Sequence, residues 1–191
     1  MPEVTGDAVE TLSTRIFDRA LLRGTFTLRS GQVSDRYLDK YRATCDPDLL
    51  GPIAARFAEL LREIDPAATH ILAPELGAVP LASALGLAAG LPFAIVRGTA
   101  KGYGTANRLE GIWAPAARAV LVEDVVTTGG AALDALEVGR TAGLIIERTL
   151  CVLDRDCGGA EALAAAGAPL TSILDADDLN AAFDAGLGVQ A

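Results

Sequence analysis

Two adjacent carboxylates, Glu123 and Asp124, stand directly before a Thr/Gly-rich segment in the stretch VLVEDVVTTGGAALD. The apolar run before them predicts a buried strand, and the Ala/Leu-rich run after Gly130 predicts a helix. A helix N-terminus offers unpaired N–H groups and a positive dipole end, which favour a bound anion. The carboxylates would repel a phosphate, so their partners are hydroxyl donors or a hydrated divalent cation. The pattern predicts a ligand with both a phosphate and sugar hydroxyls, such as a ribose 5-phosphate.

The turn between the strand and the helix carries the groups that a phosphate needs. Gly129 and Gly130 have no Cβ, so the backbone can approach a phosphate closely. Thr127 and Thr128 add hydroxyl donors. The plain alternative is an acidic strand-to-helix turn without a ligand, which is common in α/β proteins. An acid pair together with TTGG is more specific than a lone glycine motif and favours the ligand site.

The elements that must position this site alternate between helices and strands. Asp46 before Pro47 is a typical helix start, and the Ser30–Gly31 pair indicates a turn between short strands. The predicted order is a helix at 9–21, short strands within 26–39, a helix at 49–64, a strand at 70–74, a helix at 79–89, a strand at 92–97, the strand and helix around 120–134, a strand at 145–153, a helix at 159–166, a strand at 170–174 and a C-terminal helix. This alternation predicts a mostly parallel sheet with helices on both faces, and open sheets of this kind bind ligands at the carboxyl ends of their strands.

Composition excludes several classes of protein. The chain has 191 residues, which suits one domain, and its formal net charge of −9 argues against general binding of nucleic acid or of anionic membranes. The three cysteines, Cys45, Cys151 and Cys157, lack metal-ligand spacing, and His70 is the single histidine. We therefore expect no zinc site and reduced thiols, as in a cytoplasmic protein.

The stretch 76–96 carries no charge and is long enough for a membrane span. Pro80, Gly86, Gly90 and Pro92 divide it, however, into a turn, a helix and a strand. The polar, acidic start of the chain is unlike a signal peptide. We expect no association with a membrane.

The segment EDVVTTGG at 123–130 resembles the phosphoribosyl-pyrophosphate (PRPP) signature of the type I phosphoribosyltransferases. Between about Phe26 and Arg155, further segments resemble the orotate phosphoribosyltransferase family within that group. The start FTLRSG with Ser34, Tyr37, Asp39 and Lys40 resembles the family's substrate-binding start, Asp154–Arg155 resembles its orotate-contacting pair, and Arg97, Lys101, Tyr103, Gly104 and Glu110–Gly111 resemble its mobile catalytic loop.

The resemblance implies an α/β type I phosphoribosyltransferase fold made of a single domain over 1–191. A small hood for the base would come from 1–40 and the C-terminal part. It also implies a homodimer in which the loop 98–110 reaches the neighbouring active site, with Mg²⁺ as cofactor and PRPP and orotate as substrates. The ion would be held by PRPP and water, with no direct protein ligand.

The reaction implied by the resemblance converts orotate and PRPP to orotidine 5′-monophosphate and pyrophosphate, a step of UMP biosynthesis. Lys101, Glu123 and Asp124 would be catalytic, and Arg29, Thr127 and Arg155 would bind orotate. The implied PRPP contacts are Arg97, Lys101, Tyr103, Glu123, Asp124, Val125, Val126, Thr127, Thr128, Gly129, Gly130 and Ala131. No side-chain nucleophile is needed, which agrees with the lack of a Ser/His or Cys/His set.

Three departures from the family pattern leave two alternatives open. Gly98 stands where many members have lysine, Tyr103 where many have histidine, and Leu76–Gly77 where many have a Tyr-Lys pair. Because the PRPP signature is shared among related families, a transferase for a purine or another base is one alternative. A PRPP-sensing regulator without turnover is the other, and the missing lysines favour it.

Overall fold

The computed structural model describes residues 6–27, 31, 33–98 and 108–190, and the side chains from Leu12 onward. Its main sheet contains the strands β3 (His70–Pro74), β4 (Phe93–Val96), β5 (Leu109–Gly111), β6 (Arg118–Val126), β7 (Ile145–Asp154) and β8 (Leu170–Leu174). Their spatial order is β5-β4-β3-β6-β7-β8. All neighbouring pairs are parallel except β4 with β5. Since β6 lies between β3 and β7, its carboxyl end is central in the sheet.

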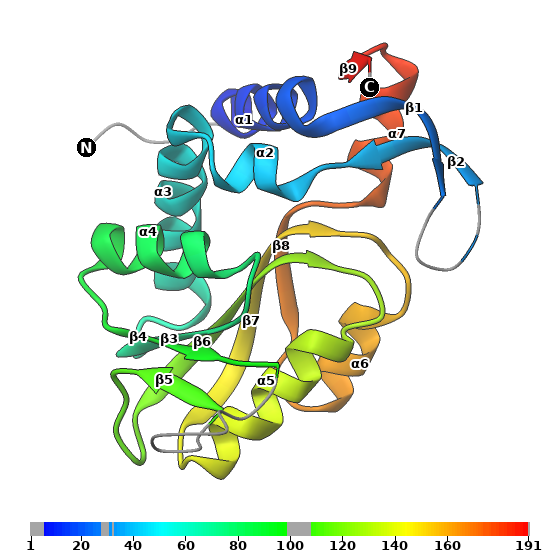
Figure 1. The fold of residues 1–191 in the computed structure, drawn as a ribbon. Coiled ribbons are helices and arrows are strands. Elements are labelled where there is room, and N and C mark those ends of the chain that lie inside the picture. The colour runs from blue at the N-terminus through cyan, green and yellow to red at the C-terminus, as the bar shows by residue number, and fades with distance from the viewer. Residues whose placement is uncertain (1–5, 28–30, 32, 99–107, 191) are drawn as a thin grey trace.

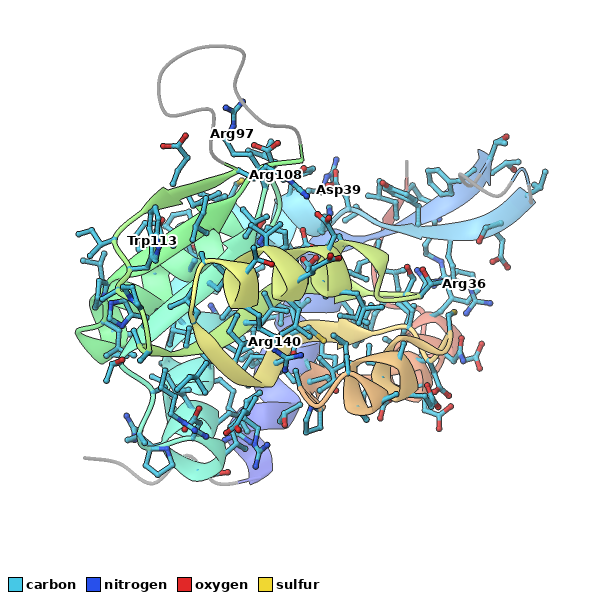
Figure 2. All side chains as sticks on the ribbon, turned by 90° about the horizontal axis from the view of Figure 1, so that it is seen from below. Arg36, Asp39, Arg97, Arg108, Trp113 and Arg140 are labelled. Atoms are coloured by element: carbon cyan, nitrogen blue, oxygen red, sulfur yellow. The ribbon has the colours of Figure 1, made fainter. Side chains whose placement is uncertain are left out.

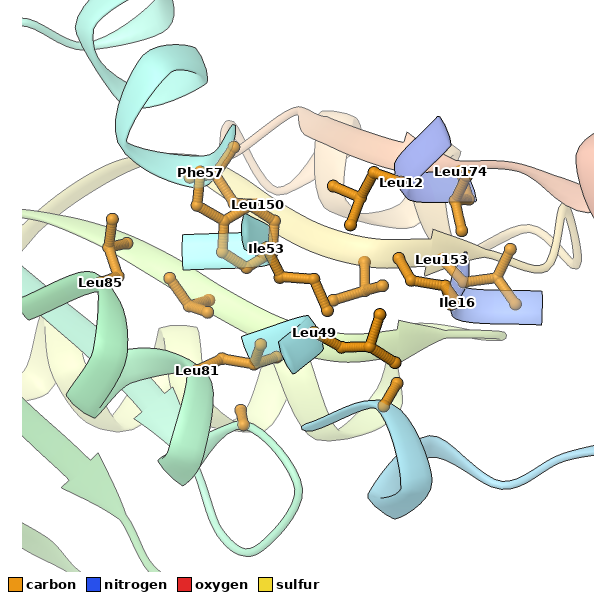
Figure 3. Close-up of a cluster of buried hydrophobic side chains, with 14 of the residues drawn as sticks. Leu12, Ile16, Leu49, Ile53, Phe57, Leu81, Leu85, Leu150, Leu153 and Leu174 are labelled. Carbon is orange, nitrogen blue, oxygen red and sulfur yellow. The ribbon is translucent and has the colours of Figure 1, made fainter. Parts of the chain in front are cut away.

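Helices cover both faces of this sheet (Figure 1). On one face lie α3 (Pro47–Ile64) and α4 (Val79–Ala89), and on the other lie α5 (Gly130–Thr141) and α6 (Gly159–Ala165). Each face has its own cluster of buried apolar side chains. Figure 3 shows the first cluster, where Ile53 and Phe57 of α3 pack near Leu150 of β7. This two-sided cover explains why residues 71–74 of β3 and 119–122 of β6 are apolar and buried on both faces of the sheet.

A second, three-stranded sheet lies beside the ends of the main sheet (Figure 1). It contains β1 (Leu21–Thr27), β2 (Val33–Leu38) and β9 (Val189–Gln190) in the order β2-β1-β9. The helices α1 (Gly6–Ala20), α2 (Lys40–Thr44) and α7 (Ala176–Asp184) accompany it. The guanidinium groups of Arg23 and Arg36 each lie 3.9 Å from the ring centre of Phe183, and these cation–π contacts join α7 to β1 and β2.

Local sequence signals account for several helix ends. The side chain of Asp46 accepts a hydrogen bond from the N–H of Asp48 at 3.0 Å, and Pro47 occupies the first helical position of α3. Asp175 and Asp178 form a reciprocal capping box at the start of α7. Gly90 ends α4 in the left-handed conformation that glycine adopts without strain.

The predicted order of the elements is confirmed, and β3, α4 and β8 have the predicted bounds. The predicted first helix ends one residue early because Leu21 begins β1. Three short elements, α2, β5 and β9, were not predicted from the sequence, because two to five residues carry too little periodicity. The charge-free stretch 76–96 is divided as expected, and no helix in the described part of the chain is long and apolar enough to cross a membrane.

The prediction of an irregular loop over 98–110 is wrong at its end. Leu109 and Glu110 belong to β5 and pair antiparallel with β4, and the N–H of Arg97 donates to the carbonyl of Arg108 at 2.8 Å. The loop composition concealed this strand, because only three of its residues are in the ladder. Strand pairing therefore continues up to the base of the loop.

Gly159 allows α6 to pack directly against the turn that follows β6. A Cβ at Gly159 would lie 2.4 Å from the carbonyl oxygen of Thr127 and 2.5 Å from Val126. We expect Gly159→Ala to lower the free energy of unfolding by about 1–3 kcal/mol, because backbone atoms would have to move. The matched control is Gly51→Ala in α3, where a Cβ meets nothing within 4 Å and should stabilise the helix by up to about 1 kcal/mol. Equal unfolding curves for the two variants in urea would contradict this packing.

Candidate active site

The acidic pair lies within β6 near its carboxyl end, whereas the sequence suggested that the strand stops just before or at the pair. β6 continues through Glu123 and Asp124 to Val126, and both carboxyl groups are buried. Consecutive side chains of a strand point to opposite faces of the sheet. The strand continues because pairing with β7 extends to Val126 opposite Asp154. The pair is thus fixed by a regular ladder on the central strand.

Asp124 has three close neighbours that fix its carboxylate. Its Oδ2 lies 2.8 Å from Nζ of Lys40, and its Oδ1 accepts a hydrogen bond from the N–H of Val125 at 2.6 Å. A Cβ at Gly77 would lie only 1.5 Å from Oδ2. Gly77 follows β3 in the chain, so the carboxylate fills the space that any other residue type there would need. The side chain of Asp124 is only 3% exposed.

The charges of the pair differ because their surroundings differ. Burial, together with the charge of Asp124, raises the pKa of Glu123 from 4.5 to about 8. Burial lowers the pKa of Lys40, but its hydrogen bond and attraction to Asp124 outweigh this, and the pKa lies above its usual 10.5. At neutral pH, Glu123 therefore carries a proton, while Asp124 is paired with an ammonium ion.

The turn after β6 presents backbone donors at the start of α5. Gly129 adopts φ of 77°, and α5 begins at Gly130 with no side chain bonded to its first N–H groups. Thr127, Thr128 and Ala131 are exposed around this helix start. The first N–H groups of a helix need an outside partner, and an anion satisfies them well. The geometry supports the predicted phosphate site.

Glu75 directly follows β3, and its side chain contacts residues that follow the neighbouring strand β4. Its Oε1 accepts a hydrogen bond from the N–H of Gly98 at 2.7 Å, and its Oε2 lies 3.7 Å from Nε of Arg97. The peptide bond between Glu75 and Leu76 is cis.

Arg108 directly precedes the neighbouring edge strand β5. Its Nε donates to the carbonyl of Arg97 at 2.9 Å, and its guanidinium lowers the pKa of its ion-pair partner Asp134. Figure 2 shows Arg97 and Arg108 on the same side of the molecule.

Arg155 directly follows β7 and lies beside the turn that follows β6. Its N–H donates to the carbonyl of Val126 at 2.8 Å, which places its backbone beside the end of β6. Its side chain is partly exposed and makes no ion pair within the described part of the chain. A guanidinium in this place is available to an anionic ligand.

The structure brings most of the predicted site residues to one edge of the sheet. Glu123 to Ala131 form the strand end and helix start, Arg155 lies beside them, and Arg97 follows β4, two strands away. The predicted residues Arg29, Lys101 and Tyr103 lie outside the described residues.

Sequence reasoning missed the contacts of Lys40, Glu75 and Gly77. Lys40 belonged only to the resembling N-terminal segment, and Gly77 was noted only as a departure from the family pattern. The Asp39–Lys40 start of α2 gave one usable signal, since Asp39 accepts a hydrogen bond from the N–H of Tyr41 as a helix cap. No local pattern indicates that Lys40 contacts Asp124.

Comparisons with known proteins place the chain in a family. No family model matches it. The orotate phosphoribosyltransferase of Halobacterium salinarum is 44% identical over 156 residues, which are 82% of this chain and 87% of that protein. The orotate phosphoribosyltransferase of Nocardioides sp. is 40% identical over 177 residues, 92% of this chain and 97% of that protein.

A solved structure agrees with these relatives. The orotate phosphoribosyltransferase of Mycobacterium tuberculosis, in complex with Fe(III) dicitrate, superposes with a TM-score of 0.81 at 32% identity, covering 90% of this chain and 98% of that one. The same enzyme in complex with PRPP gives a TM-score of 0.77. The fold is thus that of the phosphoribosyltransferases, as the sequence predicted. Within that class, the chain belongs to the orotate phosphoribosyltransferase family.

The raised pKa of Glu123 makes stability depend on pH. The folded chain holds a proton on Glu123 that the unfolded chain releases near pH 4.5, so unfolding becomes easier as the pH rises toward about 8. Glu123→Gln removes the ionisable carboxyl group and with it this pH dependence of the free energy of unfolding. We expect its free energy of unfolding to improve relative to the wild type by about 1–3 kcal/mol between about pH 5 and about pH 8. Urea unfolding of both proteins measures the difference, and a constant difference across this window would contradict the assigned proton.

Proposed function

We propose that this chain transfers the 5-phosphoribosyl group of PRPP to orotate and releases pyrophosphate and orotidine 5′-monophosphate, in UMP biosynthesis. The observation that carries the proposal is the acidic pair of β6 beside the uncapped start of α5. These two features match the hydroxyls and the phosphate of one ribose 5-phosphate. Membership of the orotate phosphoribosyltransferase family favours orotate over a purine, and turnover over sensing alone.

The 5′-phosphate would bind at the turn after β6. Backbone N–H groups from Val125 to Ala131, with the hydroxyls of Thr127 and Thr128, would surround it. Asp124 and Glu123 would contact the ribose hydroxyls. Asp124, which pairs with Lys40, would also stabilise positive charge that develops on the ribose as pyrophosphate leaves.

The leaving pyrophosphate needs positive charge around it. Arg97 at the end of β4 would supply part of this charge, and Lys101 and Tyr103 would add an ammonium and a hydroxyl donor from the loop. Closure of the loop 98–110 would exclude water from the reacting ribose. Catalysis then rests on positioning and electrostatics, with no covalent intermediate.

Orotate would bind beside Arg155. The planar guanidinium can pair with the orotate carboxylate through two hydrogen bonds, and its backbone is fixed against Val126. Thr127 follows Val126 in the chain, and we expect Thr127 and Arg29 to complete the base site. The base would thus meet the ribose at the carboxyl ends of β6 and β7.

Mg²⁺ would be held by PRPP and water rather than by protein side chains. The donor set supports this, because Lys40 already neutralises Asp124 and Glu123 carries a proton at neutral pH. When bound, the ion would neutralise charge on the pyrophosphate. The protein's part is to hold the ribose hydroxyls and to leave room for hydrated metal.

We also propose a homodimer in which the loop 98–110 serves the neighbouring active site, and a cytoplasmic location. Strand pairing of β4 with β5 gives the loop a rigid base from which it could extend. The location is supported by the cysteines, because Cys45, Cys151 and Cys157 are all free thiols.

A direct assay tests the proposed reaction. Purified protein is incubated with PRPP, Mg²⁺ and, in separate tubes, orotate, uracil, adenine, guanine or hypoxanthine. We expect loss of orotate absorbance only, together with release of pyrophosphate, and no turnover after the metal is removed with EDTA until Mg²⁺ is added back. Turnover of another base would overturn the substrate. Binding of PRPP without turnover of any base would indicate a sensor.

Mixing two inactive variants tests the shared active site. We expect Lys101→Ala and Asp124→Asn each to lower kcat by about 100- to 1,000-fold, because each removes charge that stabilises the transition state. If the loop acts on the neighbouring subunit, co-refolded mixtures regain about a quarter of wild-type activity, since mixed dimers hold one intact site. A mixture as inactive as its components would show that each loop serves its own subunit.

A further inference from the structure

We propose that Lys40 is a positioning residue for the transfer reaction, which acts through Asp124: it holds in place the carboxylate that receives the ribose hydroxyls and brings positive charge to it. This inference rests on the proposed function and adds a residue to it. It starts from the 2.8 Å contact between Nζ of Lys40 and Oδ2 of Asp124.

The backbone at Lys40 is fixed from two sides. Lys40 begins α2, and the preceding Asp39 caps that helix by accepting the N–H of Tyr41 at 3.1 Å. The N–H of Asp39 donates in turn to the carbonyl of Ala20 at the end of α1, at 2.8 Å. The ammonium therefore reaches Asp124 from an anchored helix start, and it links the smaller sheet to the central strand of the larger one.

The ion pair is packed against the turn that follows β3. The position of a Cβ at Gly77 would be 1.5 Å from Oδ2 of Asp124 and 3.0 Å from Nζ of Lys40. Both charged groups thus occupy space that only glycine leaves free. With the N–H of Val125 on Oδ1, the carboxylate has a defined place before any ligand binds.

Only Lys40 brings positive charge to this carboxylate within the described residues. Glu123 precedes it on β6, the thiol of Cys151 on β7 lies opposite Glu123 and interacts with both carboxyl groups, and Tyr41 follows Lys40 on α2. Without Lys40, two buried carboxyl groups would stand in sequence with no cation to separate their ionisation. The pair would then hold less negative charge at neutral pH, and the charge that it offers to the ribose would fall.

A merely structural ion pair predicts a different outcome. It would change the stability of the fold but not the pH dependence of catalysis, because the carboxylate would ionise as before. A positioning role predicts that PRPP use and its pH profile change together. The charge of lysine, rather than its shape, should then be what matters.

The test compares Lys40→Met and Lys40→Arg with Arg42→Met, which removes an exposed cation from the same helix. We expect Lys40→Met to lower kcat/KM for PRPP by about 10- to 100-fold at neutral pH, because a buried charge loses its partner. Its activity should recover as the pH is raised from about 7 to about 9. The kcat/KM of Lys40→Arg for PRPP should stay within about fivefold of the wild-type value, and that of Arg42→Met should equal the wild-type value. Both variants should keep the wild-type pH profile.

Each outcome decides the question. A Lys40→Met protein with wild-type KM and pH profile, or one that loses only melting temperature, overturns the inference. If Lys40→Met does not fold, Gly77→Ala replaces it, since its Cβ displaces Asp124 without removing charge; an unchanged KM for PRPP there overturns the inference too. Failure of the wild type to use PRPP and orotate would instead refute the proposed function.

Discussion

Burial of two adjacent carboxyl groups at the end of β6 is the constraint that the rest of the site depends on. An ionised carboxylate in a buried position is costly unless a cation or hydrogen bonds compensate it. The fold meets this demand differently for each group: Asp124 pairs with Lys40, and Glu123 keeps a proton, as its pKa of about 8 indicates. One negative charge is thereby held ready at a fixed place. A ligand with hydroxyl groups can use that charge without first organising it.

The position of β6 in the sheet explains why other elements converge there. From β3 the chain continues outward to β4 and β5, and from β6 it continues in the opposite direction to β7 and β8. The helices that follow β3 and β6 therefore cover opposite faces of the sheet, and open α/β sheets typically bind their ligands at such a reversal, outside the carboxyl ends of the strands. Gly77 after β3 permits the close approach of Asp124, which a Cβ would obstruct, and Gly129 after β6 adopts a φ of 77°, which glycine tolerates without strain.

Sequence patterns predicted the long elements because those are set locally. Pro and Gly bound the helix Val79–Ala89, and an apolar run identified the strand His70–Pro74. The two-residue strand β9 could not be found in this way, since it exists only through its pairing with β1. Likewise, EDVVTTGG located the turn between β6 and α5, whereas the contact of Lys40 with Asp124 joins distant segments and left no local signal. Local chemistry was thus readable from the sequence, and the partners brought by tertiary packing were not.

Gly77 shows how a departure from a family pattern changes meaning in three dimensions. In the sequence, glycine at this position reads as the loss of a lysine and so as a thinner positive charge near the phosphates. In the structure, the carboxylate of Asp124 occupies the space of a side chain at 77, and the ammonium of Lys40 lies 3.0 Å from the same point. A lysine at 77 would have to displace Asp124 from the place where Lys40 and Val125 hold it. Positive charge is therefore present here, and it comes from α2 instead of from the turn after β3.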